Sequence, residues 1–138
     1  MKFKEWAINE EILSLLAIAD RLKKPIVQIA QNVCNLRQYG GLCSYIAESV
    51  VKTLSPKLKS YGIGITEYWG PEGFKFNGRD HVSVAIYRHS TKEAVEIDIP
   101  DSNYQTKTGD NYKKLTNVFL STKNVVITSL EYSQFSED

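Results

Sequence analysis

Apolar residues recur every three or four positions through the first third of the chain, which is the spacing of amphipathic helices. The pattern predicts a helix over 4–22. A second helix is predicted to begin at Pro25, because proline is tolerated in a first turn, and to end at Gly40 and Gly41. The apolar positions are Trp6, Ile8, Ile12, Leu13, Leu15, Leu16, Ile18, Ala19 and Leu22, then Ile26, Ile29, Ala30 and Val33.

A third helix is predicted over 42–59, directly after the two glycines. Its apolar stripe again follows helical spacing, and Cys43 lies at the N-terminal end of that stripe. Pro56 falls late in this segment, so we expect it to kink the helix or end it near Leu54.

After residue 60 the pattern changes from helical spacing to alternation, which is typical of strands. Strands are predicted over 61–69, 80–87, 94–99 and 125–132. The segments 70–79 and 100–112 are rich in turn residues and are predicted to be loops, whereas 112–120 fits either a short helix or a strand. Helices followed by strands predict an α+β fold, with N-terminal helices packed on a mostly antiparallel sheet in a single domain over 1–138.

Composition and charge narrow the classes of partner. The chain has 138 residues, 42% of them hydrophobic, which suits a globular protein that buries a core. Lysine and arginine number 17 against 16 for aspartate and glutamate, so neither nucleic acid nor an anionic membrane is expected as a partner. We see no signal peptide and no membrane-spanning stretch, so the expected location is the cytoplasm, with export as an effector left open. The oligomeric state stays open.

Cysteine and histidine usage gives no sign of a structural metal site. The chain contains two cysteines and two histidines, without a CxxC pair. We therefore expect no metal and no cofactor. A disulfide between Cys34 and Cys43 is possible by count, but a reducing cytosol would keep both thiols free.

Three residues at the ends of predicted elements suggest a chemistry. Cys43 lies at a helix start, His81 at a strand start and Asp98 at a strand end. A helix N-terminus favours a thiolate, a nearby histidine can transfer its proton, and a carboxylate can orient that histidine. Backbone N–H groups at the helix start, including that of Cys43, would face an oxyanion. The set predicts a thiol acyl-transfer site.

The register of the two central strands can be predicted from their apolar positions. If the loop is 88–91, Val84 lies opposite Val95 and the apolar faces agree. The same register places His81 directly opposite Asp98, with Cβ atoms about 4.5–5.5 Å apart.

Other titratable residues fit the site less well. His89 is eight residues beyond His81 along the strand, and Cys34 lies inside a predicted helix. Asp80 is expected to point to the opposite face from His81, and Glu96 to lie one pair further along from Asp98. Each of the three chosen residues also has an ordinary structural explanation: a core thiol, a structural histidine and a turn-capping aspartate.

The chain resembles the transglutaminase-like and papain-like cysteine enzymes over about 40–100. The resemblance is carried by Gly-Leu-Cys-Ser-Tyr-Ile-Ala at 41–47, Asp-His-Val-Ser-Val-Ala-Ile-Tyr at 80–87 and Glu-Ile-Asp-Ile-Pro at 96–100. It implies a papain-like core with Cys43 as nucleophile, His81 as base and Asp98 as orienting carboxylate.

The resemblance has departures as well as matches. Gln38 lies near the place of the glutamine that donates to the oxyanion in papain-like peptidases, and Trp69 is a further candidate for contacting substrate. The tryptophans usual in transglutaminase-like enzymes are replaced by Val84 and by Ala94 or Val95.

Two functions of different classes remain open at this point. The first is a cysteine-dependent enzyme that acts on protein or peptide amides as a peptidase, deamidase or transglutaminase. The second is a non-catalytic interaction module of the same fold, which would bind a partner through its first helix or the 70–79 loop. Selective alkylation of Cys43 near neutral pH separates the two.

Overall fold

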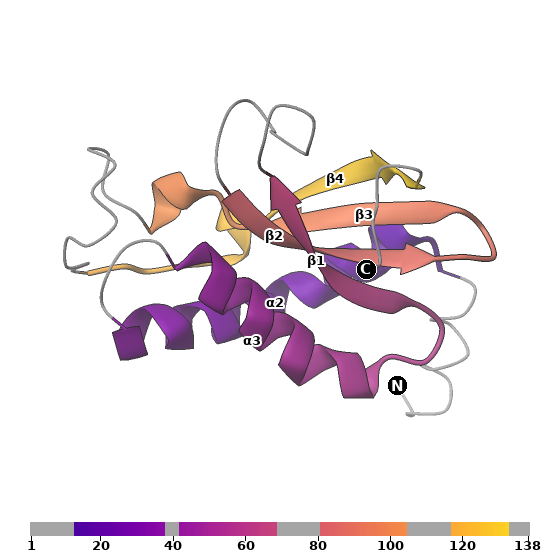
Figure 1. The fold of residues 1–138 in the computed structure, drawn as a ribbon. Coiled ribbons are helices and arrows are strands. Elements are labelled where there is room, and N and C mark those ends of the chain that lie inside the picture. The colour runs from indigo at the N-terminus through magenta and orange to yellow at the C-terminus, as the bar shows by residue number, and fades with distance from the viewer. Residues whose placement is uncertain (1–12, 38–41, 69–80, 105–116, 133–138) are drawn as a thin grey trace.

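The computed structural model describes residues 13–37, 42–68, 81–104 and 117–132, and the side chains within these ranges except those of 67 and 68. Figure 1 shows two helices on one side of a four-stranded sheet. The helices are α2 (Leu15–Arg37) and α3 (Cys43–Leu54). The strands are β1 (Gly62–Tyr68), β2 (His81–Arg88), β3 (Glu93–Asp98) and β4 (Val126–Glu131), and short 3-10 turns are η1 (Ser55–Lys57), η2 (Asp101–Asn103) and η3 (Thr122–Asn124).

Helix α2 is one continuous helix where the sequence predicted two. It runs through Pro25, which lies inside it rather than at a start. The apolar stripe continues without interruption across the proline, so burying one long face outweighs the backbone hydrogen bond that proline removes, a loss of about 3 kcal/mol. The buried residues of α2 are Leu15, Ile18, Ala19, Ile26, Ala30, Val33 and Cys34. Residues 4–12 of the predicted first helix lie outside the described ranges.

Helix α3 begins and ends where the sequence indicates. It starts at Cys43 and ends at Leu54, and the chain continues as the 3-10 turn η1, with Pro56 inside it. The prediction that Pro56 ends the helix near Leu54 is therefore confirmed. The cause is the missing proline N–H and the clash of its ring with the preceding turn.

All four predicted strands are present, and each pairs antiparallel with the next in the order β1-β2-β3-β4. This confirms the α+β class with an antiparallel sheet. The predicted loop 70–79 and most of the ambiguous segment 112–120 lie outside the described ranges. Residues 117–120 have no regular secondary structure.

The main core lies between the helices and one face of the sheet. Val84 and Ile86 from β2, with Val95 and Ile97 from β3, pack in the same cluster as Ala30 of α2 and the other buried helix residues. The opposite face of the same strands is also buried, at Ala85 and Ala94 and at the polar residues Ser83 and Glu96. Burial on both faces keeps the centre of the sheet away from water.

The predicted hairpin register is wrong by two residues. Val84 pairs with Ile97 rather than Val95, and Ile86 pairs with Val95. The turn comprises 89–92 because β2 extends to the buried Arg88, which pairs with Glu93. Lys92 closes the turn with a positive φ of 58°. A shift of two preserves which face each side chain points to, so the apolar pattern is satisfied in both registers.

Across the described ranges, no helix combines the length and apolarity needed to cross a membrane. Helix α2 is the longest described helix, and it carries exposed charged side chains at Asp20, Arg21 and Lys24.

Candidate active site

Cys43 is the first residue of α3, and it is half-buried beside the core. The first bond within this helix runs from the Ile46 N–H to the Leu42 carbonyl, at 2.9 Å. The N–H groups of Cys43, Ser44 and Tyr45 therefore precede the first intrahelical bond. The N-cap position is held by the buried Leu42, which has no polar side chain to cap those amides. The backbone donors at the helix start accordingly lie next to the thiol.

His81 connects the thiol to a carboxylate. Its Nε2 lies 2.6 Å from Asp98 Oδ1, and its ring also contacts the Cys43 side chain. The His81 side chain is 2% exposed and that of Asp98 is 12% exposed. The three residues chosen from the sequence thus come together at the end of the sheet. Because of the shifted register, His81 and Asp98 are diagonal rather than directly opposed, a separation that long side chains can span.

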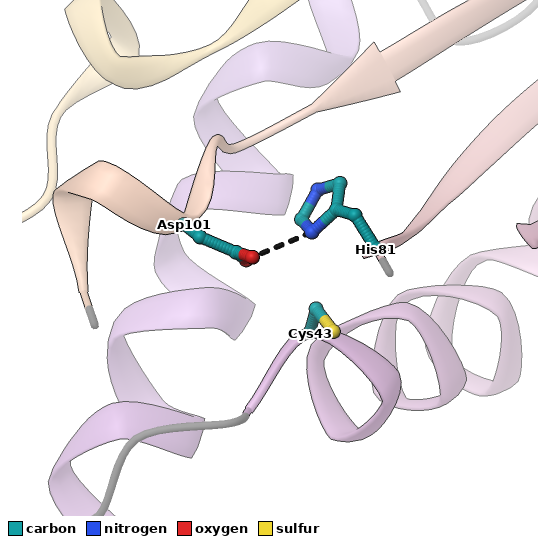
Figure 2. Close-up of side chains that lie close together, drawn as sticks. All are labelled: Cys43, His81 and Asp101. Carbon is teal, nitrogen blue, oxygen red and sulfur yellow. Dashed lines mark ion pairs between the residues drawn. The ribbon is translucent and has the colours of Figure 1, made fainter. Parts of the chain in front are cut away.

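Asp101 is a fourth member of the cluster that the sequence analysis missed. Its Oδ1 lies 2.8 Å from His81 Nδ1, so the imidazole stands between two carboxylates. Figure 2 shows Asp101, on η2, reaching the ring beside Cys43 at the start of α3. The sequence offered only an aspartate directly after Pro100, in a segment predicted to be an ordinary loop.

Hydrogen bonds around η2 hold Asp101 in place. The buried Tyr104 donates its hydroxyl to Asp101 Oδ1 at 2.9 Å, and its backbone N–H donates to the Asp101 carbonyl. Burial, followed by the Asp101 charge, raises the pKa of Tyr104 above its ordinary value, so the hydroxyl stays a donor. Asn103 accepts from the Asn124 side chain at 2.7 Å, which ties η2 to η3.

The charges around His81 determine its protonation state. Burial of the ring by itself would lower the pKa, but the neighbouring Asp101 and Asp98 carboxylates and the Cys43 contact outweigh it. Together they raise the pKa of His81 to about 11. The imidazole is therefore a cation at neutral pH, with Nε2 hydrogen-bonded to Asp98 and Nδ1 2.8 Å from the Asp101 carboxylate.

Two of the competing titratable residues, Cys34 and His89, lie away from the site, as predicted. Cys34 is buried inside α2, where burial raises the pKa of its thiol. His89 is exposed in the turn after β2, where its ring contacts the Tyr132 hydroxyl. The two residues predicted to assist with the oxyanion or substrate, Gln38 and Trp69, lie outside the described residues, as does Asp80.

Glu96 belongs to a separate polar cluster on the sheet face away from the main core. It is 6% exposed, and its Oε2 accepts a hydrogen bond of 2.6 Å from the Ser83 hydroxyl. The Ser83 hydroxyl also contacts that of Thr66 on β1. Burial, and then the charge of Asp98, raises the pKa of Glu96 to about 7. Glu96 pairs with Ala85 across the sheet, further along the strands than His81.

The raised pKa of Glu96 predicts a pH-dependent stability. Folding favours the neutral form of this carboxyl. The stability that this gives is complete below the unfolded pKa, near 4.5, and is lost as the pH rises through 7 and the buried group ionises. Between pH 4.5 and pH 8 the wild type should lose on the order of 2–3 kcal/mol of unfolding free energy through Glu96, and Glu96→Gln should not show this loss. Urea unfolding at both pH values measures it, and the exposed Glu48→Gln on α3 reports the effect of removing one charge elsewhere. Equal pH dependence in wild type and Glu96→Gln would contradict the assignment.

Cys43 lines a small cavity. Its lining is mainly apolar, and Cys43, Ser83, Asp98 and Tyr104 add the polar groups. The apolar walls come from both helices and the central strands, including Ile26, Ala47 and Ile97. Cys43 therefore borders both an apolar cavity and the cluster of His81 and Asp101.

Comparison with protein-family models, curated proteins and solved structures finds no match to this chain. What the site can do chemically is argued below from its own geometry.

Proposed function

We propose that this chain is a cysteine-dependent acyl-transfer enzyme with a papain-like or transglutaminase-like core, acting on protein or peptide amides. The observation that carries the proposal is that one buried histidine, His81, contacts both the Cys43 side chain and the Asp98 carboxylate. A nucleophile, a proton carrier and an orienting group in mutual contact are the minimum for this chemistry.

The charge state of His81 defines the first step. The thiolate is the nucleophilic form of a cysteine side chain, and a cationic imidazole carries a proton that it can give to a leaving group. In the proposed reaction the Cys43 thiolate attacks the amide carbonyl and forms a tetrahedral intermediate. His81 then gives its Nδ1 proton, which lies beside Asp101 in the resting site, to the leaving amine as the C–N bond breaks, which leaves a Cys43 thioester and a neutral imidazole.

The second step regenerates the site. Neutral His81 takes a proton from water or from an acceptor amine, which attacks the thioester and releases the product and the thiolate. Water would complete hydrolysis or deamidation, and an amine would complete transamidation. Asp98 at 2.6 Å keeps the ring oriented through both steps.

The helix start supplies a place for the developing negative charge. The backbone N–H groups of Cys43, Ser44 and Tyr45 lie before the first intrahelical hydrogen bond. Donors of this kind, positioned before the reaction begins, stabilise an oxyanion by roughly 2.7–4 kcal/mol each. The apolar Leu42 at the N-cap position leaves these N–H groups uncapped by a side chain. A helix with an apolar N-cap is less stable than one with Ser, Thr, Asp or Asn there.

Selective alkylation tests the proposal directly. Iodoacetamide is expected to label Cys43 much faster than Cys34 at pH 7, because thiolate fraction and access control the rate. Cys34 is 4% exposed inside α2, and burial raises the pKa of its thiol. Mass spectrometry of peptides from a time course gives both rates in one sample.

Equal labelling of the two thiols, or preference for Cys34, would contradict Cys43 as the nucleophile. Amine or ammonia release from a mixed peptide library then tests for turnover. A reactive Cys43 without turnover on any amide would favour the interaction module. Of its expected contact surfaces, the structure describes the first predicted helix from residue 13 onward, and the 70–79 loop lies outside the described ranges.

A further inference from the structure

Three chemically different ligand groups converge at the candidate active site. The Cys43 sulfur, a His81 ring nitrogen and an Asp101 carboxylate oxygen all lie within 4.8 Å of one another. They come from three elements that meet at one end of the sheet, as Figure 2 shows. Thiolate, imidazole and carboxylate are the groups that bind Zn²⁺ in proteins.

The surroundings of His81 are those of a metal-binding histidine. Its Nε2 is engaged by Asp98 Oδ1 at 2.6 Å, while its Nδ1 lies 2.8 Å from Asp101 Oδ1. Metal-bound histidines almost always donate their other ring N–H to a carboxylate, carbonyl or water, which fixes the ring. Tyr104 orients the Asp101 carboxylate in the same way, through a hydrogen bond of 2.9 Å.

The spacing of the donors suits a tetrahedral ion after small adjustments. Zinc bonds of about 2.0–2.3 Å place two ligand atoms roughly 3.3–3.8 Å apart. The His81–Asp101 pair at 2.8 Å must open slightly, and the widest pair, at no more than 4.8 Å, must close by at most about 1 Å. Three protein ligands leave a fourth position open to water or to another small ligand.

We propose that Cys43, His81 and Asp101 bind one Zn²⁺ ion reversibly, and that the bound ion blocks the nucleophile. The blocking clause rests on the proposed acyl-transfer function, whereas the binding clause does not. Coordination uses the Cys43 thiolate and the Nδ1 lone pair of His81, so a proton on either group passes to solvent. The thiolate electron pair is then held by the metal and is no longer available to attack a carbonyl.

This proposal departs from the expectation of no metal that the sequence supports. Zinc motifs are recognised by short spacings such as CxxC. Here Cys43 and His81 are 38 residues apart along the chain, and His81 and Asp101 are 20 residues apart. Only folding brings the start of α3, the start of β2 and η2 together.

Titration of the reduced, metal-free full chain with Co²⁺ tests the binding clause. We expect one ion per chain, with the intense visible bands of a tetrahedral site and a thiolate-to-cobalt charge-transfer band, and displacement of Co²⁺ by Zn²⁺. Cys43→Ser should abolish the charge-transfer band, and Asp101→Asn should weaken zinc binding. Asp98→Asn should weaken it by about 10–100-fold, because it removes the group that fixes His81.

Matched controls keep the test specific. Cys34→Ser removes the other thiol, inside α2, and should bind Co²⁺ as wild type does. Circular dichroism of each variant reports its folding, and the near-isosteric Cys43→Ser serves if Asp101→Asn unfolds. Absence of the charge-transfer band in wild type, its persistence in Cys43→Ser, or unchanged zinc affinity in folded Asp101→Asn would each overturn the site.

The blocking clause has a separate readout. Stoichiometric Zn²⁺ should slow iodoacetamide labelling of Cys43 in wild type by at least about 10-fold, because a thiolate bound to zinc is not available to react. The effect should be smaller in Asp101→Asn, and Cys34 labelling should not change. Cobalt binding without any amide turnover would support the metal site while the proposed enzyme function fails. Fast, zinc-insensitive labelling of Cys43 would overturn the blocking clause.

Discussion

Cys43→Ala is expected to abolish turnover, with a loss of up to about 10⁶-fold if the site behaves like other nucleophile triads. The substitution removes one sulfur atom from a half-buried helix start, so the fold should persist. Loss of activity in a folded variant would then report lost chemistry. The assay follows amine or ammonia release from the peptide library, with circular dichroism as a check on folding.

The combination of variants is more informative than any single one. His81→Ala should cost nearly as much as Cys43→Ala, and the double variant should be no worse than the worse single, because residues that act as one unit lose activity non-additively. Asp98→Ala should cost less, since Asp98 orients His81 at 2.6 Å rather than reacting. Cys34→Ala, which removes the buried thiol of α2, should retain activity.

Full activity in Cys43→Ala, measured where the wild type acts, would end the enzyme proposal. Additive losses from Cys43→Ala and His81→Ala would mean that the two residues contribute independently rather than as a thiol–imidazole pair. Either result would direct attention to the interaction module.

His81 is expected to remain a cation well above neutral pH. The ordinary pKa of histidine is about 6.5, and the site raises the pKa of His81 to about 11, chiefly because Asp101 and Asp98 outweigh the effect of burial. Because the folded pKa is the higher one, the stabilisation is complete below about pH 6.5 and is lost as the pH rises towards 11.

The expected loss is large. Between pH 7 and pH 10 the wild type should lose up to about 4 kcal/mol of unfolding free energy through His81, close to 1.36 kcal/mol for each pH unit. His81→Gln should not show this part of the loss, so the difference between the two proteins should narrow as the pH rises. Urea unfolding at each pH measures both.

Nitrogen NMR of the imidazole rings gives the protonation state directly. The chain has two histidines, so His89→Gln assigns the remaining ring signals to His81. We expect those signals to stay in the protonated position at pH 9 and to titrate lower in Asp98→Asn and Asp101→Asn. Deprotonation of wild-type His81 near pH 6.5 would contradict the charge cluster around this ring.

The local patterns of the sequence were sufficient to locate one helix, the four strands and three residues of the candidate site. Apolar spacing located α3 and its end near Leu54, and alternation located all four strands, because these periodicities are properties of a single segment. The prediction of which side chains share a face of β2 and β3 also held, although the register was wrong. A shift of two residues leaves His81 and Asp98 able to meet, whereas a shift of one would have separated them.

The length of α2 and the register of the sheet depend on residues distant in the sequence, so only the tertiary structure could decide them. Pro25 signals a helix start locally, but burial of one apolar stripe carries α2 through it. The register of β2 and β3 was set by the buried Arg88 and the positive φ of Lys92, neither of which apolar alternation reports.

Asp101 is the clearest case of a residue whose role tertiary structure alone assigns. In the sequence it is one acidic residue in a loop, and nothing in its spacing from Cys43 or His81 indicates a contact. Tyr104 and the η2 turn place its carboxylate 2.8 Å from His81 Nδ1. The sequence determined which chemical groups the chain carries and on which elements they lie. The charge of His81 depends on through-space distances to two carboxylates, and such distances exist only once the helix start, the strand ends and the turn have packed together.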